Sequence, residues 1–244
     1  MRYAIYVTPP ANDPLTRLAA RWLGRDAFAD APLPHPEPVA LAPNLVSALT
    51  AQPRRYGFHA TLKAPFRLQR GVQDYDLIAA LTSLASEFAP VVVPSLRVNQ
   101  LGDFFALTPV APTPDTDRLA AYVVEALDPF RAELNEEEFA GYRAAGLTPH
   151  QQDLLRTWGY PYVFDAFRFH MSLTGPVAKA ERAVVYRALE NLFAPVVSHP
   201  LVIDRLHLFV EQGEGGNFRV RFSARLGAHG AVPAPADAEM ERCA

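Results

Sequence analysis

The chain has 244 residues, 50% of them hydrophobic and 20% charged, which is enough to bury the core of one large domain or of two small lobes. Its formal net charge of −3 argues against a protein that holds long or duplex nucleic acids by their phosphates, but it is compatible with a small anionic substrate in a local basic pocket. The single cysteine, Cys243, excludes an intramolecular disulfide and a cysteine-rich metal site. No segment reads as a signal peptide or as an apolar run of about 18 residues, so we expect a cytoplasmic protein with no membrane partner.

The N-terminal region predicts a strand, a helix and an extended connection. Residues 2–9 (RYAIYVTP) read as a strand ended by a pair of prolines, and residues 13–24 read as a short helix that is capped by Asp13 and ended by Gly24. Residues 31–43 hold five prolines and predict an extended surface segment. Alternation along the strand predicts two faces, one with Tyr3, Ile5 and Val7 and the other with Arg2, Ala4 and Tyr6.

A short motif occurs twice in the chain. Residues 54–65 (RYGFHATLKAPF) read as a buried strand, and residues 167–176 (FRFHMSLTGP) repeat its order of aromatic residue, His, any residue, hydroxyl residue and Leu. Each copy is followed by a helix-like run, by the letters FAPVV at 88–92 or 193–197, and by a further strand. The repeated order predicts an α+β protein with a duplicated bilobal fold. In this fold two pseudo-symmetric lobes, each an antiparallel sheet with packed helices, have a cleft between them.

The repeat also divides the chain. We expect lobe one over about 44–112, a helical insert over about 115–158 and lobe two over about 160–226, all within a single bilobal domain over 1–226. We hypothesise that the insert covers the cleft as a lid and sets the size of the substrate. Residues 227–244 combine small residues, proline and charge without periodicity, and we expect them to form a disordered tail.

The motif strands are expected to turn their polar faces toward the cleft, because side chains alternate between the two faces of a strand. In the first copy the polar face holds Gly57, His59, Thr61 and Lys63, and the apolar face holds Tyr56, Phe58, Ala60 and Leu62. In the second copy the polar face holds Arg168, His170, Ser172 and Thr174. If the lobes pack about a pseudo-twofold axis, two histidines and two hydroxyl groups face one another across the cleft.

Two histidines opposite two hydroxyl groups suit the cleavage of a phosphodiester. One imidazole can remove a proton from the attacking water or hydroxyl while the other protonates the leaving oxygen, because imidazole titrates near neutral pH. The Thr61 and Ser172 hydroxyls can donate hydrogen bonds to the phosphate oxygens, and Lys63 and Arg168 can add positive charge. This chemistry requires no metal and no cofactor. Candidate pocket aromatics are Tyr6, Tyr56, Tyr160 and Tyr162.

The paired His-x-Thr/Ser motifs on a duplicated fold resemble the 2H phosphoesterase superfamily. The stretches RYAIYVTP, YGFHATLKAPF and FRFHMSLTGP resemble its bacterial branch associated with phosphonate metabolism, and the resemblance covers about residues 1–226. It implies that His59 and His170 are the general acid and base and that Thr61 and Ser172 hold the phosphate. The implied activity is that of a metal-independent cyclic phosphodiesterase, a phosphoric diester hydrolase, with a 2′,5′ RNA ligase-like activity as the alternative. The implied partner is a small anionic substrate such as a cyclic nucleotide, a ribose cyclic phosphate or an RNA end.

Two other functions stay open from the sequence. A metal phosphoesterase could use His59, His170 and His207, although HxHxDH-type or Asp-rich ligand spacing is absent from the sequence. A non-catalytic module could hold a nucleotide or phosphate without turning it over. ATP-driven chemistry is not expected, because the sequence has no G-x-x-x-x-G-K-[ST] phosphate loop.

Overall fold

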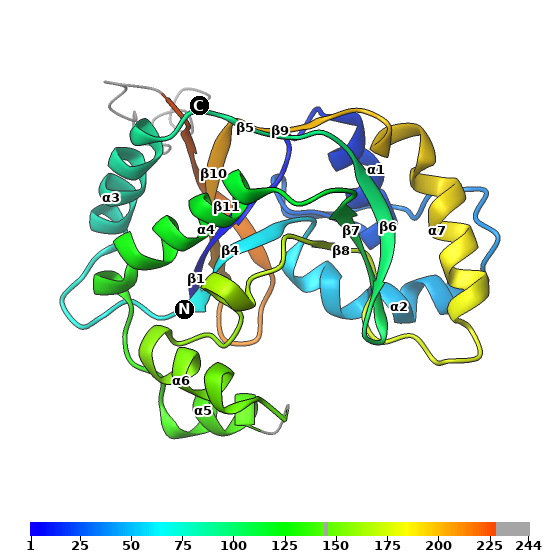
Figure 1. Ribbon diagram of the computed structural model, residues 1–244. Coiled ribbons are helices and arrows are strands. Elements are labelled where there is room, and N and C mark those ends of the chain that lie inside the picture. Colours follow the sequence, from blue (N-terminus) through cyan, green and yellow to red (C-terminus); the bar gives the residue numbers. More distant parts are fainter. Residues whose placement is uncertain (144–145, 228–244) are drawn as a thin grey trace, which may run out of the picture.

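The computed structural model describes residues 1–143 and 146–227, so the predicted tail from residue 228 onward lies outside the described residues. A seven-stranded antiparallel sheet lies at the centre of the molecule, with the strand order β11-β10-β1-β4-β8-β7-β6 (Figure 1). Its strands are β1 (Tyr3–Val7), β4 (Ala60–Phe66), β6 (Leu96–Leu101), β7 (Phe104–Pro109), β8 (Met171–Ser172), β10 (Arg205–Glu211) and β11 (Phe218–Arg225). Two short pairs, β2 (Arg25–Asp26) with β3 (Ala31–Pro32) and β5 (Val91–Val93) with β9 (Leu201–Ile203), complete the β structure that the described residues show.

Helices cover the sheet at both of its ends. They are α1 (Pro14–Leu23), α2 (Pro43–Tyr56), α3 (Asp74–Glu87), α4 (Pro114–Ala126), α5 (Glu136–Arg143), α6 (Pro149–Trp158) and α7 (Arg182–Val197), with two 3-10 turns, η1 (Asp128–Phe130) and η2 (Phe164–Ala166). Helix α3 packs on β10 and β11, α4 packs on β4, and α7 packs on β6 and α1. Helices α5 and α6 lie below this body in Figure 1. None of the described helices is both long and apolar enough to cross a membrane.

The expected duplication is confirmed, and its two halves are interlaced. The first half runs β4-α3-β5-β6-β7 and the second runs β8-α7-β9-β10-β11, so each consists of a motif strand, a helix, a short strand and a hairpin. The β6-β7 hairpin of the first half pairs with β8 of the second, and the β10-β11 hairpin of the second half joins β4 of the first through β1. Each lobe in space therefore contains elements of both sequence halves, and the two motif strands meet at the centre of the sheet.

Two local predictions about the repeat are wrong. The first motif strand begins at Ala60, because α2 continues to Tyr56 and Gly57 ends it with a φ of +78°. The FAPVV letters are not equivalent in structure: the first copy leaves α3 and enters β5, whereas the second lies at the end of α7. The equivalent short strands are β5 and β9, which pair with each other. Helix α4, within the predicted insert, packs in the main core, where Leu119 and Val123 are fully buried.

The predicted alternation along β1 is confirmed, and it separates the core from the opposite sheet face. Tyr3, Ile5 and Val7 belong to the main hydrophobic core, whereas Ala4 and Tyr6 pack in a second cluster with Phe209 and Phe218. We call this second cluster the aromatic floor. It lies on the sheet face that also carries His59 of the first motif, whose ring stacks on Tyr6.

The helix ends follow the sequence signals. The Asp13 side chain accepts a hydrogen bond from the Leu15 amide at the start of α1, and Gly24 ends that helix in the left-handed conformation. Thr148 and Gln151 form a reciprocal capping box at the start of α6.

Candidate active site

The pairing of β4 with β8 brings the two motifs together. Ala60 lies opposite Met171 in this antiparallel pair, and both side chains are buried in the core. The residues on either side point to the other face, so the register places His59 opposite Ser172 and Thr61 opposite His170. Each histidine therefore faces the hydroxyl residue of the other motif. This register agrees with the expectation that the two histidines and the two hydroxyl groups oppose one another.

Both histidines are held by the same local hydrogen bond. Nδ1 of His59 lies 2.9 Å from the Gly57 carbonyl oxygen, and Nδ1 of His170 lies 2.8 Å from the Arg168 carbonyl oxygen. In each case Nδ1–H donates to the carbonyl two residues earlier, which leaves Nε2 as the nitrogen free to take or give a proton. Nε2 of His59 lies 3.2 Å from Oγ1 of Thr61, within reach of the hydroxyl as a donor.

The two imidazoles differ in their surroundings. Burial lowers the pKa of His59 to about 4, the hydrogen bond to the Gly57 carbonyl opposes this shift, and the nearby charge of His170 adds to it. His59 is therefore neutral at pH 7. His170 is more open to solvent, with the Phe104 ring beside it at a centroid distance of 5.9 Å. The site thus holds one imidazole that burial keeps neutral at pH 7 and a second that is more open to solvent.

Aromatic rings surround His59. Tyr6 stacks on it with ring centroids 3.7 Å apart and planes inclined by 19°, and Tyr56 lies 6.3 Å away. The prediction that Tyr56 occupies the apolar strand face is wrong, because Tyr56 is the last residue of α2 and its ring stacks on Phe218. Tyr6 thus packs beneath His59 as a buried residue, and the half-buried Tyr56 borders it.

Tyrosines of the insert extend this aromatic region. Tyr160 contacts Tyr142 and Tyr162 edge to face, at centroid distances of 6.0 and 5.4 Å. Burial raises the pKa of Tyr142 to about 12 and that of Tyr160 further, with smaller contributions from the neighbouring Tyr56. Tyr56 is a neighbour of both Tyr142 and Tyr160, so these tyrosines of the insert lie on the His59 side of the site. Tyr142 was not predicted, since nothing in the helical insert linked it to the motifs.

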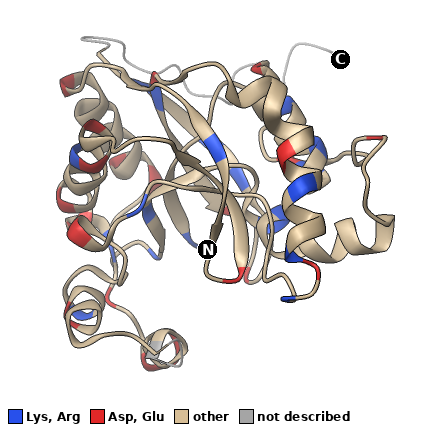
Figure 2. Cartoon of the chain, turned by 45° about the vertical axis from the view of Figure 1, so that its right-hand side comes forward, with Lys and Arg blue, Asp and Glu red and all other residues tan. Residues whose placement is uncertain are grey.

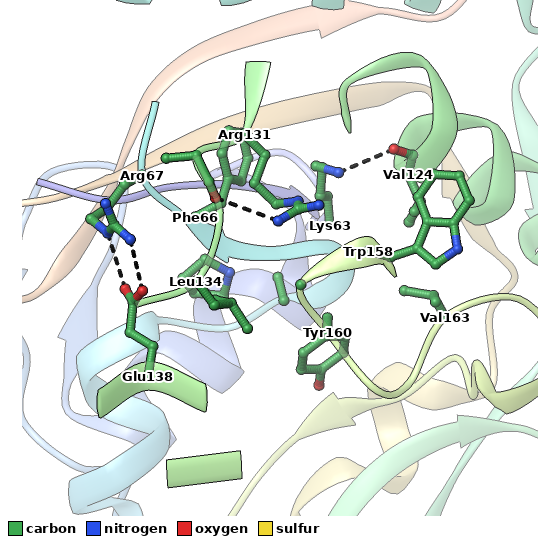
Figure 3. Close-up of a pocket in the computed structure, with 14 residues that line it drawn as sticks. Lys63, Phe66, Arg67, Val124, Arg131, Leu134, Glu138, Trp158, Tyr160 and Val163 are labelled. Carbon is green, nitrogen blue, oxygen red and sulfur yellow. Dashed lines mark hydrogen bonds and ion pairs between the residues drawn. The ribbon is translucent and has the colours of Figure 1, made fainter. Parts of the chain in front are cut away.

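Lys63 does not share the Thr61 face, contrary to the prediction from simple alternation. The β1-β4 register shifts between Tyr6, which pairs with Thr61, and Ile5, which pairs with Lys63. This bulge turns Lys63 toward α4, where its Nζ donates to the Val124 carbonyl and to Asp128, each at 3.1 Å. Figure 3 shows Lys63 directed at Val124 in a pocket that Arg131, Trp158 and Tyr160 also line. Its partners are those of a buried structural ion pair.

Arg168 lies on the extended segment before β8, and its guanidinium turns back to the carbonyls of Phe167 and Asp165, at 2.9 and 3.3 Å. It borders a pocket of about 330 Å³ that is also lined by Arg97, Asn99 and Thr108. Arg168 precedes His170 by two residues. Within the described residues, its guanidinium donates hydrogen bonds to neighbouring backbone carbonyls.

His207 is bound on both nitrogens. Its Nε2 lies 3.0 Å from the Thr8 carbonyl and its Nδ1 lies 2.8 Å from the Ser223 hydroxyl. Burial lowers the pKa of His207 to about 4, and the residue is 1% exposed. Within residues 1–143 and 146–227, no three His, Cys, Asp or Glu side chains are grouped so as to hold a metal ion.

Two arginines that were not predicted as site residues lie beyond the aromatic floor. Arg2 and Arg55 both bind the buried carboxylate of Glu211. Arg2 could have been found from the sequence, because it shares a strand face with Tyr6. Arg55 gave no such signal, because its segment reads as a strand and is in fact the end of a helix.

The two His-x-Thr/Ser motifs of this duplicated α+β fold thus lie side by side at the central strand pair. The chain belongs to the family described as "Protein of unknown function (DUF1045)", whose model matches residues 61–219.

Two relatives with curated names share the chain's sequence. One is "Ribose 1,5-bisphosphate phosphokinase PhnN" of Janthinobacterium sp. (strain Marseille), which is 38% identical over 232 residues that cover 92% of this chain and 51% of the relative. The other, of the same name, is from Laribacter hongkongensis (strain HLHK9) and is 34% identical over 220 residues, or 90% of this chain and 50% of the relative. The chain spans about half the length of the curated relatives it matches.

Among solved structures, the chain is similar to TT0787 of Thermus thermophilus, with 16% identity, a TM-score of 0.44, and coverage of 94% of this chain and 100% of that chain. It is also similar to E. coli LigT complexed with 3′-AMP, with 12% identity, a TM-score of 0.42, and coverage of 93% and 98%.

Proposed function

We propose that this protein is a metal-independent cyclic phosphodiesterase that opens a cyclic phosphate by two-histidine general acid–base catalysis. The observation that carries the proposal is the crossed register of β4 and β8, which sets each histidine opposite the hydroxyl residue of the other motif. Such a site can bind a phosphate between two hydroxyl donors while one imidazole lies on either side of the reacting phosphorus.

The surroundings of the histidines favour one division of roles. His59 is neutral at pH 7 because burial lowers its pKa to about 4, so it serves as the base, and the more exposed His170 serves as the acid. Water attacks phosphorus and gives its proton to Nε2 of His59, while the doubly protonated ring of His170 gives its Nε2 proton to the ester oxygen as the phosphorus–oxygen bond of the ring breaks. Thr61 and Ser172 donate hydrogen bonds to the phosphate oxygens, whose charge grows in the transition state.

The substrate is proposed to be a ribose cyclic phosphate. The support is chemical: relatives that contain a region similar to this chain are named for a kinase that acts on ribose 1,5-bisphosphate, and a ring-opened ribose cyclic phosphate is a ribose phosphate of the same class. The kinase activity itself is not proposed for this chain, because its sequence has no G-x-x-x-x-G-K-[ST] phosphate loop. Acidic and basic residues both occur on the helices in Figure 2. We therefore propose that charged groups close to the site attract the substrate, and not a charge of one sign over the whole surface.

The test is phosphorus NMR of the purified protein with ribose 1,2-cyclic phosphate, 2′,3′-cyclic nucleotides and a 2′,5′-linked dinucleotide, each with and without EDTA. We expect ring opening of ribose 1,2-cyclic phosphate that survives EDTA and falls by about 10²- to 10⁴-fold in His59→Ala and in His170→Ala. His199→Ala, which removes an exposed histidine, is the control and retains full activity.

Three results would contradict the proposal: no opened substrate, turnover that EDTA abolishes, or full activity in either site variant. Binding without turnover would favour the non-catalytic module, and cleavage only of the 2′,5′-linked dinucleotide would favour the RNA ligase-like activity.

A further inference from the structure

Arg2, Arg55 and Glu211 form a charged cluster on the site face of the sheet, at the end of β1. Nε and Nη2 of Arg2 donate to the two carboxylate oxygens of Glu211, at 2.8 and 2.7 Å. Nη2 of Arg55 donates to the same carboxylate, and Nε of Arg55 donates to the Gly216 carbonyl at 3.0 Å. The Glu211 side chain is 2% exposed, so a buried acid fixes two guanidinium groups side by side. We call Arg2 and Arg55 the arginine pair.

Tyr56 and the rings of the aromatic floor lie between the arginine pair and His59. The Arg55 guanidinium lies 5.4 Å from the centre of the Tyr56 ring, and that ring lies 6.3 Å from the His59 ring. The Arg2 guanidinium lies 5.7 Å from the Phe218 ring, which in turn lies 6.4 Å from Tyr6. Phe218 and Tyr6 are buried, so the half-buried Tyr56 is the ring between the arginine pair and His59 on which a sugar can lie.

The cluster keeps positive charge and free donors. Two guanidinium groups and one carboxylate leave a net positive charge, and Arg2 holds the pKa of Glu211 below its usual value, so the carboxylate stays ionised. The insert contributes an acidic residue, Glu138, on the side of the arginine pair. Its carboxylate already accepts hydrogen bonds from Nε and Nη2 of Arg67. Within the described residues no partner is found for Nη1 of Arg2 or of Arg55, and each arginine side chain is 31% exposed.

We propose that the arginine pair binds a second phosphate group of the same substrate, a terminal phosphomonoester at the other end of the sugar from the cyclic ester. This deepens the proposed function and rests on it. The cyclic ester lies between His59 and His170, the sugar lies on Tyr56, and the terminal phosphate accepts from the free Nη1 groups. Planar guanidinium groups that a buried carboxylate holds in place suit this role, because a phosphate oxyanion binds best to donors that are already oriented.

A purely structural role is the competing explanation, since the cluster also ties together β1, β10 and the end of α2. That role requires the ion pairs with Glu211 but predicts no dependence of ligand affinity on a second phosphate. The two explanations therefore separate on a pair of ligands that differ only in that group.

The experiment is calorimetric titration of the His170→Ala variant, in which the ligands stay unopened, with ribose 1,2-cyclic phosphate and with its 5-phosphorylated form. We expect the 5-phosphate to raise affinity about tenfold or more, as charge-assisted hydrogen bonds to a phosphate do. Arg2→Gln and Arg55→Gln, each added to His170→Ala, reduce this gain to about twofold or less. Arg118→Gln is the matched control, because Arg118 is exposed on α4 and pairs with Asp115 of the same helix.

A gain below about tenfold with both arginines present would overturn the proposal, and that comparison is valid even if an arginine variant fails to fold. An undiminished gain in both folded arginine variants would overturn it as well. Failure of the proposed function has a separate readout, since it appears as the absence of ring opening by the unsubstituted protein in phosphorus NMR.

Discussion

The Tyr6 ring lies nearly parallel to the His59 imidazole at a centroid distance of 3.7 Å. Tyr6 is 1% exposed and belongs to the aromatic floor with Phe209 and Phe218, so it covers one face of the imidazole and excludes water from it. This burial is the main cause of the lowered pKa of His59, and it keeps the ring neutral across the physiological range. A strand residue far from the motif in sequence therefore sets the protonation state of the proposed base.

The pH dependence of kcat/KM tests this relationship. His59 is active as a base only when it is neutral, so we expect kcat/KM to fall about tenfold per pH unit below about pH 4 and to be level just above it. Tyr6→Ala exposes the imidazole and raises its pKa toward about 6.5, which moves the acid limb to higher pH. Tyr75→Ala, at an exposed tyrosine of α3, leaves the profile unchanged. An acid limb that does not move in Tyr6→Ala would refute the role of the stack.

Acid should also destabilise the fold through the two imidazoles whose pKa values are lowered. His59 and His207 have pKa values lowered to about 4 in the folded chain, while in the unfolded chain both titrate near 6.5. Between these values the unfolded chain binds more protons, so the free energy of unfolding decreases as pH falls from about 6.5 to about 4, by roughly 3 kcal/mol for each histidine at most. Urea denaturation at pH 7 and pH 4.5 measures this loss. His207→Asn removes one titrating group, and its stability should depend less on pH than that of the wild type.

The two hydroxyls are expected to act on the rate more than on the fold. Thr61→Val and Ser172→Ala each remove one donor to the phosphate, and we expect kcat to fall about 100-fold in each. Thr61→Ser keeps the hydroxyl and retains most of the activity. Steady-state kinetics measures kcat of each variant, and thermal melts measure its stability. Equal losses of kcat in Thr61→Val and Thr61→Ser would show that the methyl group, and not the hydroxyl, supports the rate.

Gly57 is required by backbone geometry next to His59. It has a φ of +78°, a Cβ built on it would lie 2.5 Å from the Ala27 Cβ, and its carbonyl accepts from Nδ1 of His59. We expect Gly57→Ala to cost about 1–2 kcal/mol from the strained backbone alone, with a further cost from the contact, and to lower kcat at least about tenfold by moving the carbonyl. Gly71→Ala is the matched control, because Gly71 has a φ of +88° but no atom within 4 Å of its Cβ position. It should lose stability and keep its activity.

A substitution of Lys63 tests whether its side chain forms a structural ion pair or contacts the substrate phosphate. Its side chain is 4% exposed and donates to Val124 and Asp128, so Lys63→Met leaves a buried carbonyl without its donor. We expect a loss of about 1–3 kcal/mol in stability, because Asp128 keeps its pair with Arg131, and a change in kcat/KM of less than about threefold. Lys179→Met, at an exposed lysine, changes neither quantity. A tenfold loss of kcat/KM at normal stability would instead indicate that Lys63 contacts the substrate phosphate.

The sequence by itself determined the elements that depend on local chemistry and on repetition. Two copies of the order aromatic, His, any residue, hydroxyl and Leu were sufficient to predict a duplicated α+β fold and to select His59, Thr61, His170 and Ser172. The faces of residues 2–9 and the cap at Asp13 followed as well. Such signals are readable because side-chain alternation and capping hydrogen bonds act over a few residues.

The tertiary structure alone decided which residues surround the motifs. The interlaced hairpins, the stack of Tyr6 on His59 and the contact of Arg2 and Arg55 with Glu211 join segments up to 209 residues apart. Lys63 shows the same limit at short range, since one bulge pairs it with Ile5 on the core face, and a second register shift follows before Phe66. A single sequence contains no record of pairing register or of long-range packing, because both are chosen by the total free energy of the folded chain.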